Sequence, residues 1–164
     1  MEIVHCREEH LESIRAIYNH YVEHSTITFE ESPLSLEQLA ERVKNYTDRF
    51  PWLVGVDNNE VVGYAYGSPW AARCAYRNSV EVSCYLDKRF SGRGWGKRLY
   101  RALIAELRER DFHVIIAGVA LPNPASEKMQ VDAGFEKVGH FKEIGFKFGK
   151  WLDVAYWQLR LKEQ

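Results

Sequence analysis

Residues 91–97, which read S-G-R-G-W-G-K, decide how this chain folds. An apolar run that ends at Leu86 comes before them, and Leu99, Leu103 and Leu107 follow at every fourth position. The first pattern is typical of a strand and the second of a helix. The order is therefore strand, glycine loop, helix.

The glycines of this stretch, Gly92, Gly94 and Gly96, indicate what the loop binds. A chain without Cβ atoms can take positive φ angles and lets a ligand approach the main chain closely. The first turn of the helix then offers unpaired N–H groups and a partial positive charge, which suit phosphate oxygens. Four cations lie nearby in the sequence: Arg89, Arg93, Lys97 and Arg98. The stretch predicts a cradle for a diphosphate, and the alternative is a glycine-rich turn with a solvated basic rim.

Two familiar phosphate motifs are absent. A P-loop needs Ser or Thr after its Gly-Lys pair, whereas Lys97 is followed by Arg98. A dinucleotide site needs G-x-G-x-x-G early in a βαβ unit, whereas this chain has G-x-G-x-G in its second half. A hydride-transfer enzyme is therefore disfavoured.

The bulk composition fits one globular domain, which we expect to span residues 1–164. The chain is 46% hydrophobic and 27% charged, and its formal net charge of −1 argues against a nucleic-acid-binding protein. The N-terminus has no apolar core of signal-peptide length, and no window reaches the length of a membrane span. Cys6, Cys74 and Cys84 are odd in number and lack C-x-x-C spacing, so we expect a reduced, cytoplasmic protein without zinc.

Apolar periodicity and turn signals predict an α+β domain with a mixed, mainly antiparallel sheet. The predicted helices are residues 9–24, 36–46, 96–110 and 123–133, with Ser35 and Gly134 at two of their ends. The predicted strands are residues 3–6, 52–56, 61–68, 79–86, 113–120, 136–141 and 151–161. The run 113–120 is continuously apolar, which predicts a strand buried on both faces.

The glycine loop resembles the acyl-CoA pyrophosphate loop of the GNAT superfamily of N-acetyltransferases. That pattern is Gln or Arg, two residues, Gly, one residue, then Gly or Ala, and it falls here on Ser91, Gly94 and Gly96, with Ser91 departing from it. The chain is similar over nearly its whole length to the phosphinothricin and methionine sulfoximine acetyltransferase branch. The segments that carry this similarity are I-Y-N-H-Y-V around Asn19, F-P-W-L-V at 50–54, S-V-E-V-S-C-Y-L at 79–86, L-P-N at 121–123 and K-F-G-K-W-L-D at 147–153.

The resemblance implies a GNAT-like sheet flanked by helices, acetyl-CoA as co-substrate, no metal and a homodimer. It implies that main-chain groups of Cys84, Tyr85 and Leu86 pair with the pantetheine arm and the acetyl oxygen. The implied contacts of the loop with the cofactor come from Gly92, Arg93, Gly94, Trp95, Gly96 and Lys97. Asn123 is expected to hydrogen-bond the pantetheine arm, or to cap the helix that contains Ser126, a further candidate for the cofactor site; both roles can hold at once.

Glu81 is the candidate general base. It alternates out of phase with Val80 and Val82, so it projects from the other face of the strand and can accept an ammonium proton. The alternative is an exposed acid on a half-solvated strand. Cys84 is the candidate for a covalent acetyl-enzyme, but a packed thiol is favoured. Many relatives place a tyrosine where this chain has Gln130, which leaves the general acid open.

The segment 70–76, W-A-A-R-C-A-Y, lies just before the Glu81 strand and has neither helical nor strand periodicity. Arg73 is expected to clamp a carboxylate in a bidentate manner, and the alternative is a surface arginine in a loop. Further candidates for the acceptor pocket are Phe29, Glu30, Ala71, Ala72, Tyr76, Lys147 and Trp151. His20 and His113 are interpreted as structural.

These residues and the resemblance predict an N-acetyltransferase for the α-amino group of small amino-acid analogues: phosphinothricin, methionine sulfoximine or methionine sulfone. One alternative is the same chemistry on a polyamine, an antibiotic or a protein N-terminus. A second is a non-catalytic acyl-CoA-binding module, which the presence of Glu81 disfavours.

Overall fold

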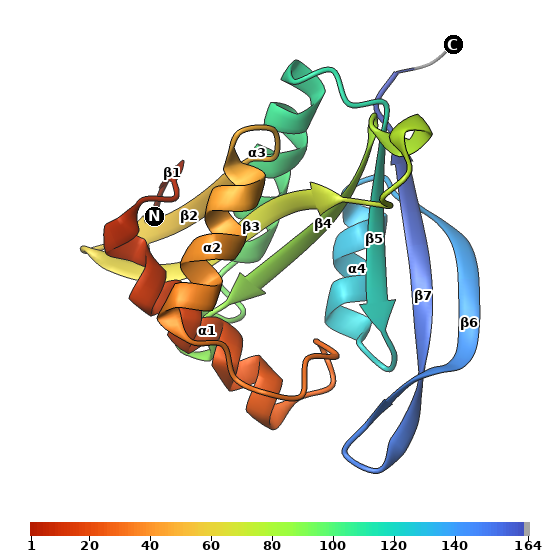
Figure 1. Cartoon of the computed structure of the whole chain (residues 1–164), viewed down its shortest axis with the longest axis horizontal. Helices are drawn as coiled ribbons and strands as arrows, with labels where there is room; N and C mark the ends of the chain where they lie inside the picture. Colours follow the sequence, from red (N-terminus) through yellow and green to blue (C-terminus); the bar gives the residue numbers. More distant parts are fainter. Residues whose placement is uncertain (163–164) are drawn as a thin grey trace. The chain divides into compact units, whose positions relative to one another are not determined.

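The computed structural model describes residues 1–162, which form seven strands and four α-helices (Figure 1). The strands are β1 (Glu2–His5), β2 (Trp52–Asp57), β3 (Glu60–Pro69), β4 (Ser79–Leu86), β5 (Val114–Ala120), β6 (Glu136–Lys147) and β7 (Lys150–Arg160). The helices are α1 (Leu11–His24), α2 (Leu36–Thr47), α3 (Trp95–Glu109) and α4 (Pro124–Asp132). Short 3₁₀ helices span Glu8–His10, Cys74–Tyr76 and Lys88–Phe90.

Hydrogen bonds join the strands in the order β1-β2-β3-β4-β5-β7-β6. The pairs β1/β2, β2/β3, β5/β7 and β6/β7 are antiparallel, whereas β4 and β5 run parallel. The predicted fold class, a mixed and mainly antiparallel sheet with flanking helices, is therefore confirmed.

The chain divides into two compact units. The first unit contains residues 1–19, 34–68 and 82–111, and the second contains residues 20–33, 69–81 and those described from Phe112 onward. β4 contributes its residues 79–81 to the second unit and its residues 82–86 to the first. The expectation of a single functional domain stays a prediction.

In the first unit, α3 packs its leucine stripe on β2. Leu99, Leu103 and Leu107 are fully buried, as their spacing predicts for one helix face. A Cβ built on Gly55 of β2 would stand 3.3 Å from a Leu99 methyl group, so this glycine lets the helix approach the strand closely. The packing fixes the N-terminal end of α3, where the glycine loop enters.

A row of aromatic rings also runs through the first unit. Trp52 stacks on Tyr66 at 4.1 Å between ring centroids, and Tyr64 stacks on Tyr85 of β4 at 5.5 Å. Tyr18 of α1 meets the Tyr85 ring edge-on at 5.2 Å. Because offset and edge-to-face pairs of aromatic rings are favourable, this row of rings holds Tyr85, near the end of β4, in place.

In the second unit, the prediction that β5 is buried on both faces is wrong. Ile115, Ala117 and Val119 are buried, but Ile116 is only half-buried and Gly118 is exposed. The alternation shows that one face of β5 packs in the core and the other stays open. The sequence run looked continuous because an apolar Ile116 and a glycine occupy the open face.

β6 is longer than predicted and continues to Lys147. A bulge between Phe141 and Gly145 interrupts its pairing with β7 and puts Glu143 at a φ of +50°. Asp153 of β7 stabilises the bulge because its carboxylate accepts the Glu143 N–H at 2.8 Å. The prediction stopped at residue 141 because the bulge breaks the period of two.

Candidate functional site

The glycine loop opens its main chain to a ligand. Gly92 has a φ of +79° and Gly94 a φ of +74°, and a Cβ built on either residue would meet no atom within 4 Å. Gly94 is also the N-cap of α3, and it has no side chain with which to cover the first helical N–H groups. The loop therefore combines left-handed backbone, open space and a helix N-terminus, as an anion cradle requires.

Gly96 is a glycine for a different reason. It is buried in the first turn of α3, where a Cβ would stand 3.0 Å from a Leu86 methyl group at the end of β4. The missing side chain thus lets the helix begin directly against the strand. This contact ties the loop to the last residues of β4.

Two of the four cations expected to rim the loop bind other groups of the protein. The Arg89 guanidinium bonds Asp87 and Glu60, each at 2.7 Å, and Arg98 donates to the Met1 carbonyl at 3.1 Å. These two arginines therefore also link the residues around the loop to one another. The partners, two carboxylates for Arg89 and a main-chain carbonyl for Arg98, lie outside the glycine stretch, so the spacing of the basic residues alone did not reveal them.

Arg93 is the cation at the centre of the loop. It is exposed, and its guanidinium lies 5.4 Å from the Phe90 ring centroid and 5.3 Å from that of Trp95. The two rings are themselves 5.3 Å apart. Cation–π contacts of this kind restrict the side chain while its charge stays in solvent.

The Cys84 thiol is packed, as the sequence interpretation favoured. Its Sγ lies 3.9 Å from the Gly96 carbonyl, and burial raises the pKa of the thiol to about 12. The thiolate is the nucleophilic form of cysteine, so Cys84 stays unreactive at neutral pH. This environment disfavours the covalent acetyl-enzyme.

Glu81 projects from the open face of the second unit. It lies opposite Ile116 in the parallel ladder of β4 and β5, and its side chain is half-buried. Burial raises the pKa of the carboxyl group, because desolvation disfavours the charged form. A carboxylate with a raised pKa is a better proton acceptor near neutral pH than an exposed one.

The segment after β3 is exposed, as expected for a loop. Its backbone forms the 3₁₀ helix Cys74–Tyr76. In the first turn of this helix, the Tyr76 N–H donates to the Arg73 carbonyl at 3.0 Å. Ala71, Ala72 and Arg73 are all exposed. The Arg73 side chain is therefore accessible, which a carboxylate clamp requires.

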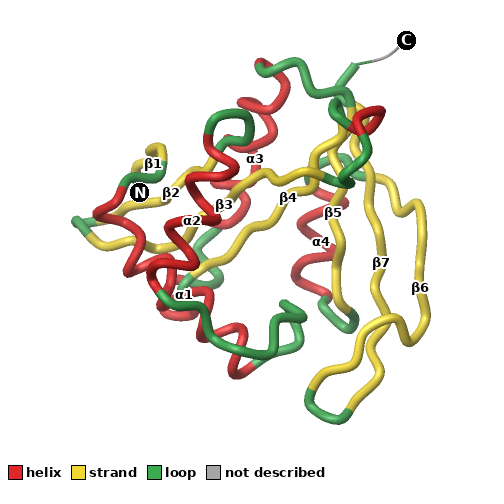
Figure 2. Tube along the Cα trace, viewed as in Figure 1, coloured by secondary structure: helices red, strands yellow, loops and turns green. Residues whose placement is uncertain are grey.

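Phe29 lies against β6 in the second unit. A Cβ on the buried Gly145 would approach the Phe29 ring to under 3 Å, so the ring occupies the space of the missing side chain. Next to it, the Lys147 ammonium donates to the Thr28 carbonyl at 2.8 Å. Lys147 is buried, which lowers the pKa of its amine, while Glu30 and Glu31 act in the opposite direction. Lys147 thus fixes the Phe29 loop, whose backbone is irregular in Figure 2.

Trp151 does not join this group. It is 62% exposed and packs beside Phe146, with the ring centroids 4.9 Å apart.

Asn123 caps α4 by accepting the Ser126 N–H at 3.1 Å, so the capping role is confirmed. Gln130 is buried, so it is part of the packing of α4.

Two residues of this face were missed by the sequence analysis, Gly118 and Tyr156. A point built as the Gly118 Cβ lies 3.6 Å from Glu81 Oε1 and 3.3 Å from the nearest Tyr156 ring carbon. A glycine inside a strand often marks a close approach of a ligand or another group, and this signal was available for Gly118. No signal in the sequence paired Tyr156 with Glu81.

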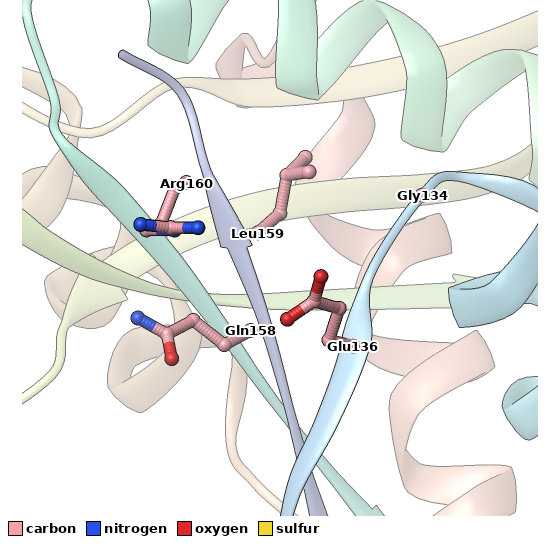
Figure 3. A pocket seen from close by; sticks show the side chains of 5 residues that line it. All are labelled: Gly134, Glu136, Gln158, Leu159 and Arg160. Carbon is pink, nitrogen blue, oxygen red and sulfur yellow. The ribbon is translucent and has the colours of Figure 1, made fainter. Parts of the chain in front are cut away.

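The structure also has a pocket of about 150 Å³ in the second unit, between the end of α4 and β7 (Figure 3). Its lining residues are Gly134, Glu136, Gln158, Leu159 and Arg160. None of the residues predicted to bind cofactor or acceptor is among them.

Within residues 1–162, no helix is long and apolar enough to cross a membrane. In the same part of the chain, no cluster of three or more His, Cys, Asp or Glu side chains is suited to a metal.

The chain is similar in sequence and in structure to known acetyltransferases. Residues 3–156 match the family model described as "Acetyltransferase (GNAT) domain". The chain is 37% identical to the phosphinothricin N-acetyltransferase of Streptomyces coelicolor, over 92% of this chain and 91% of the relative. It is 34% identical to the L-methionine sulfoximine/L-methionine sulfone acetyltransferase of Salmonella typhimurium, over 92% and 89% of the two chains. A phosphinothricin acetyltransferase from Sinorhizobium meliloti, solved in complex with acetyl-CoA, superimposes with a TM-score of 0.94 at 35% identity, over 97% and 87% of the two chains.

Proposed function

The chain belongs to the GNAT acetyltransferase family and is an N-acetyltransferase, and we propose that it acetylates the α-amino group of small amino-acid analogues. The analogues are phosphinothricin, methionine sulfoximine and methionine sulfone, which the names of its relatives specify. The single observation that carries the proposal is that one strand, β4, bears the half-buried Glu81 carboxylate and leads along the chain into the glycine loop at the start of α3.

Acetyl-CoA fits the first unit of the chain. The space over Gly92 and Gly94 and the N–H groups at the start of α3 would hold its diphosphate, with Arg93 and Lys97 as exposed cations. Main-chain groups of Cys84, Tyr85 and Leu86 would pair with the pantetheine arm, and Asn123 and Ser126 are further candidates. The bound co-substrate supplies the acetyl group as a thioester.

Glu81 acts as the general base in this proposal. The acceptor enters as an ammonium ion, and it becomes a nucleophile when its proton passes to the Glu81 carboxylate. The nitrogen lone pair then attacks the acyl carbon and the C–S bond breaks. Coenzyme A leaves as a thiolate, and its uptake of a proton balances the second proton that the nitrogen loses as the amide forms. Direct transfer fits the packed Cys84 thiol, whose raised pKa disfavours an acetyl-cysteine. Gln130 has no acidic proton to donate, so the thiolate takes its proton from solvent in this proposal.

The acceptor's carboxylate is the proposed partner of Arg73, with Tyr76, Ala71 and Ala72 in the same loop. Phe29 would form an apolar wall, held in place by Gly145 and by the Lys147 bond to Thr28. An exposed guanidinium favours a carboxylated amine, whereas a polyamine would need an acidic pocket.

The remaining parts of the proposal concern the protein's setting. We propose one acetyltransferase domain in a cytoplasmic homodimer that binds neither nucleic acid nor membranes. The β6–β7 hairpin supports a dimer because several of its large apolar side chains are exposed and could pack against a second copy. These are Phe141, Ile144, Phe146, Phe148 and Trp151. Light scattering after gel filtration measures the mass directly, and a monomer at micromolar concentration would exclude the dimer.

A panel of amines tests the proposed function. Purified protein and acetyl-CoA are mixed with phosphinothricin, methionine sulfoximine, methionine sulfone, spermidine, an aminoglycoside and a ribosomal-protein N-terminal peptide, and thiol release is followed. We expect turnover with the amino-acid analogues and a loss of activity in Glu81→Gln. Preference for the spermidine, aminoglycoside or peptide would replace the acceptor class, and binding of acetyl-CoA without turnover would favour the non-catalytic module.

A further inference from the structure

Glu81, Gly118 and Tyr156 lie side by side on three neighbouring strands of the second unit. Glu81 of β4 pairs with Ile116 of β5, and Gly118 is the next residue of β5 on the same face. Tyr156 of β7 lies directly opposite Gly118 in the antiparallel ladder. Side chains at such positions point to one side of the sheet, so the carboxylate and the phenol flank the glycine.

The absence of a side chain at Gly118 leaves a notch between the two groups. The position of a Gly118 Cβ would be 3.6 Å from Glu81 Oε1, and 3.3 and 3.8 Å from Tyr156 ring carbons Cε1 and Cζ. Gly118 itself is exposed although it sits mid-strand, so the notch is open to solvent. A water molecule over Gly118 can therefore reach the carboxylate and the phenol together.

The Tyr156 ring is held in one orientation. Trp70 and Phe141 meet it edge-to-face, with ring centroids 5.4 and 5.5 Å from its own. On the other side, β6 presents Gly139 opposite Tyr156, where a Cβ would be 4.0 Å from the Tyr156 Cβ. The two edge-to-face contacts restrict rotation of the ring, and with it the position of the phenol hydroxyl.

We propose that Tyr156 is a positioning residue for the acceptor's proton: with Glu81 it holds one water molecule in the notch over Gly118. The inference rests on the proposed function, since it assigns the route by which Glu81 receives the proton. An ammonium N–H bond breaks and its proton passes to the water, while another proton of the same water passes to Glu81 Oε1. The water is regenerated, and the amine keeps its lone pair for attack on the acyl carbon.

The ionisation of the two side chains agrees with this arrangement. Burial raises the pKa of Tyr156 and the nearby Glu81 charge raises it further, so the phenol stays protonated and can donate. Of the residues that β5 and β7 present on this face around Glu81, namely Ile116, Gly118, Tyr156 and Gln158, only Tyr156 titrates. A hydrogen bond from its hydroxyl, through the water, favours the charged carboxylate. Removing the hydroxyl should therefore raise the pKa of Glu81.

Two variants and two matched controls test the proposal in the full chain. Tyr156→Phe removes only the hydroxyl, and Gly118→Ala fills the notch, with the Tyr156 ring yielding by a few tenths of an ångström. The controls are Tyr46→Phe, which removes a phenol hydroxyl on α2, and Gly139→Ala, which adds a methyl group at ordinary contact distance on the other side of Tyr156. Each variant is measured by kcat/KM against pH with methionine sulfoximine. The Glu81 carboxyl is also titrated by carbon-13 NMR without substrates, using Glu81→Gln to assign its signal.

We expect Tyr156→Phe to move the acid limb of kcat/KM and the Glu81 titration to higher pH together. Activity at the acid end should fall by about 5-fold, the size expected for one lost hydrogen bond. Gly118→Ala should act in the same direction, and both controls should match the wild type. An unchanged titration and pH profile in Tyr156→Phe would overturn the proposal. Absence of turnover in the wild type would instead refute the proposed function, while the NMR titration would still report on the notch.

Discussion

Replacing Gly94 by alanine separates the loop's structural role from its binding role. Gly94 has a φ of +74°, a conformation that costs a non-glycine residue about 1–2 kcal/mol. Alanine also restricts the unfolded chain, which returns about 0.4–1 kcal/mol to the folded state. A Cβ at this position meets no protein atom within 4 Å, so no steric cost is added. The net loss of stability is about 1 kcal/mol, or about 2–4 °C in Tm for a chain of this size.

The loss of cofactor affinity should be much larger than this strain implies. In our proposal the open space at Gly94 receives the diphosphate of acetyl-CoA, so the methyl group would displace it from one amide donor. Hydrogen bonds to a charged group are worth about 1.5–3 kcal/mol each, which predicts a loss of about 10- to 100-fold in affinity. Isothermal titration calorimetry with acetyl-CoA measures this loss, and a thermal melt without ligand measures the stability.

Gly149 provides the matched control. It has a φ of +71° in the β6–β7 turn, and a Cβ there also meets nothing within 4 Å. Gly149→Ala should therefore lower Tm as much as Gly94→Ala while leaving the acetyl-CoA affinity unchanged. Equal affinities in the wild type and Gly94→Ala would refute the placement of the diphosphate at this glycine. A similar loss in both variants would show that general strain, and not the loop, controls binding.

Three further predictions concern the chemistry. Glu81→Gln should remove the acid limb of kcat/KM. Because burial raises the pKa of Glu81 in the folded state, the ionised carboxylate destabilises the fold as pH rises through that pKa. The variant should therefore have a higher Tm than the wild type at pH 8, and this difference should disappear at pH 4. Gly145→Ala should displace the Phe29 ring and raise KM for the acceptor several-fold with little effect on KM for acetyl-CoA, and equal changes in both would argue against an acceptor role for the Phe29 loop. Initial-rate plots should intersect, because the Cys84 thiol stays protonated at neutral pH, whereas parallel lines would indicate an acetyl-enzyme.

The order of helices and strands could be predicted because local rules agree with the fold in most of the chain. Ser35 accepts the Gln38 N–H as the predicted helix cap, and Gly134 takes a φ of +87° after α4. Where local rules and tertiary structure differ, the prediction was wrong. β6 continues past its bulge because the Asp153 carboxylate accepts the Glu143 N–H. These two residues are far enough apart in the sequence that a local pattern does not contain both.

The candidate site was predictable where a residue type is dictated by its own backbone. Gly92 and Gly94 have positive φ, and the loop could be located from its glycines and from the strand and helix patterns on either side of them. The neighbourhood of Glu81 could not be, because Gly118 and Tyr156 reach it only through the pairing of β4, β5 and β7. Arg89 likewise looked like a free cation until the structure showed its bonds to Asp87 and Glu60.

Product analysis tests the central claim most directly. Methionine sulfoximine, acetyl-CoA and the protein are incubated at neutral pH, and the product is identified by mass spectrometry and NMR beside a reaction with Glu81→Gln. The account predicts one acetyl group on the α-amino nitrogen, formed by the wild type and strongly reduced in the variant. An undiminished yield from Glu81→Gln, or acetylation of a different atom, would contradict it.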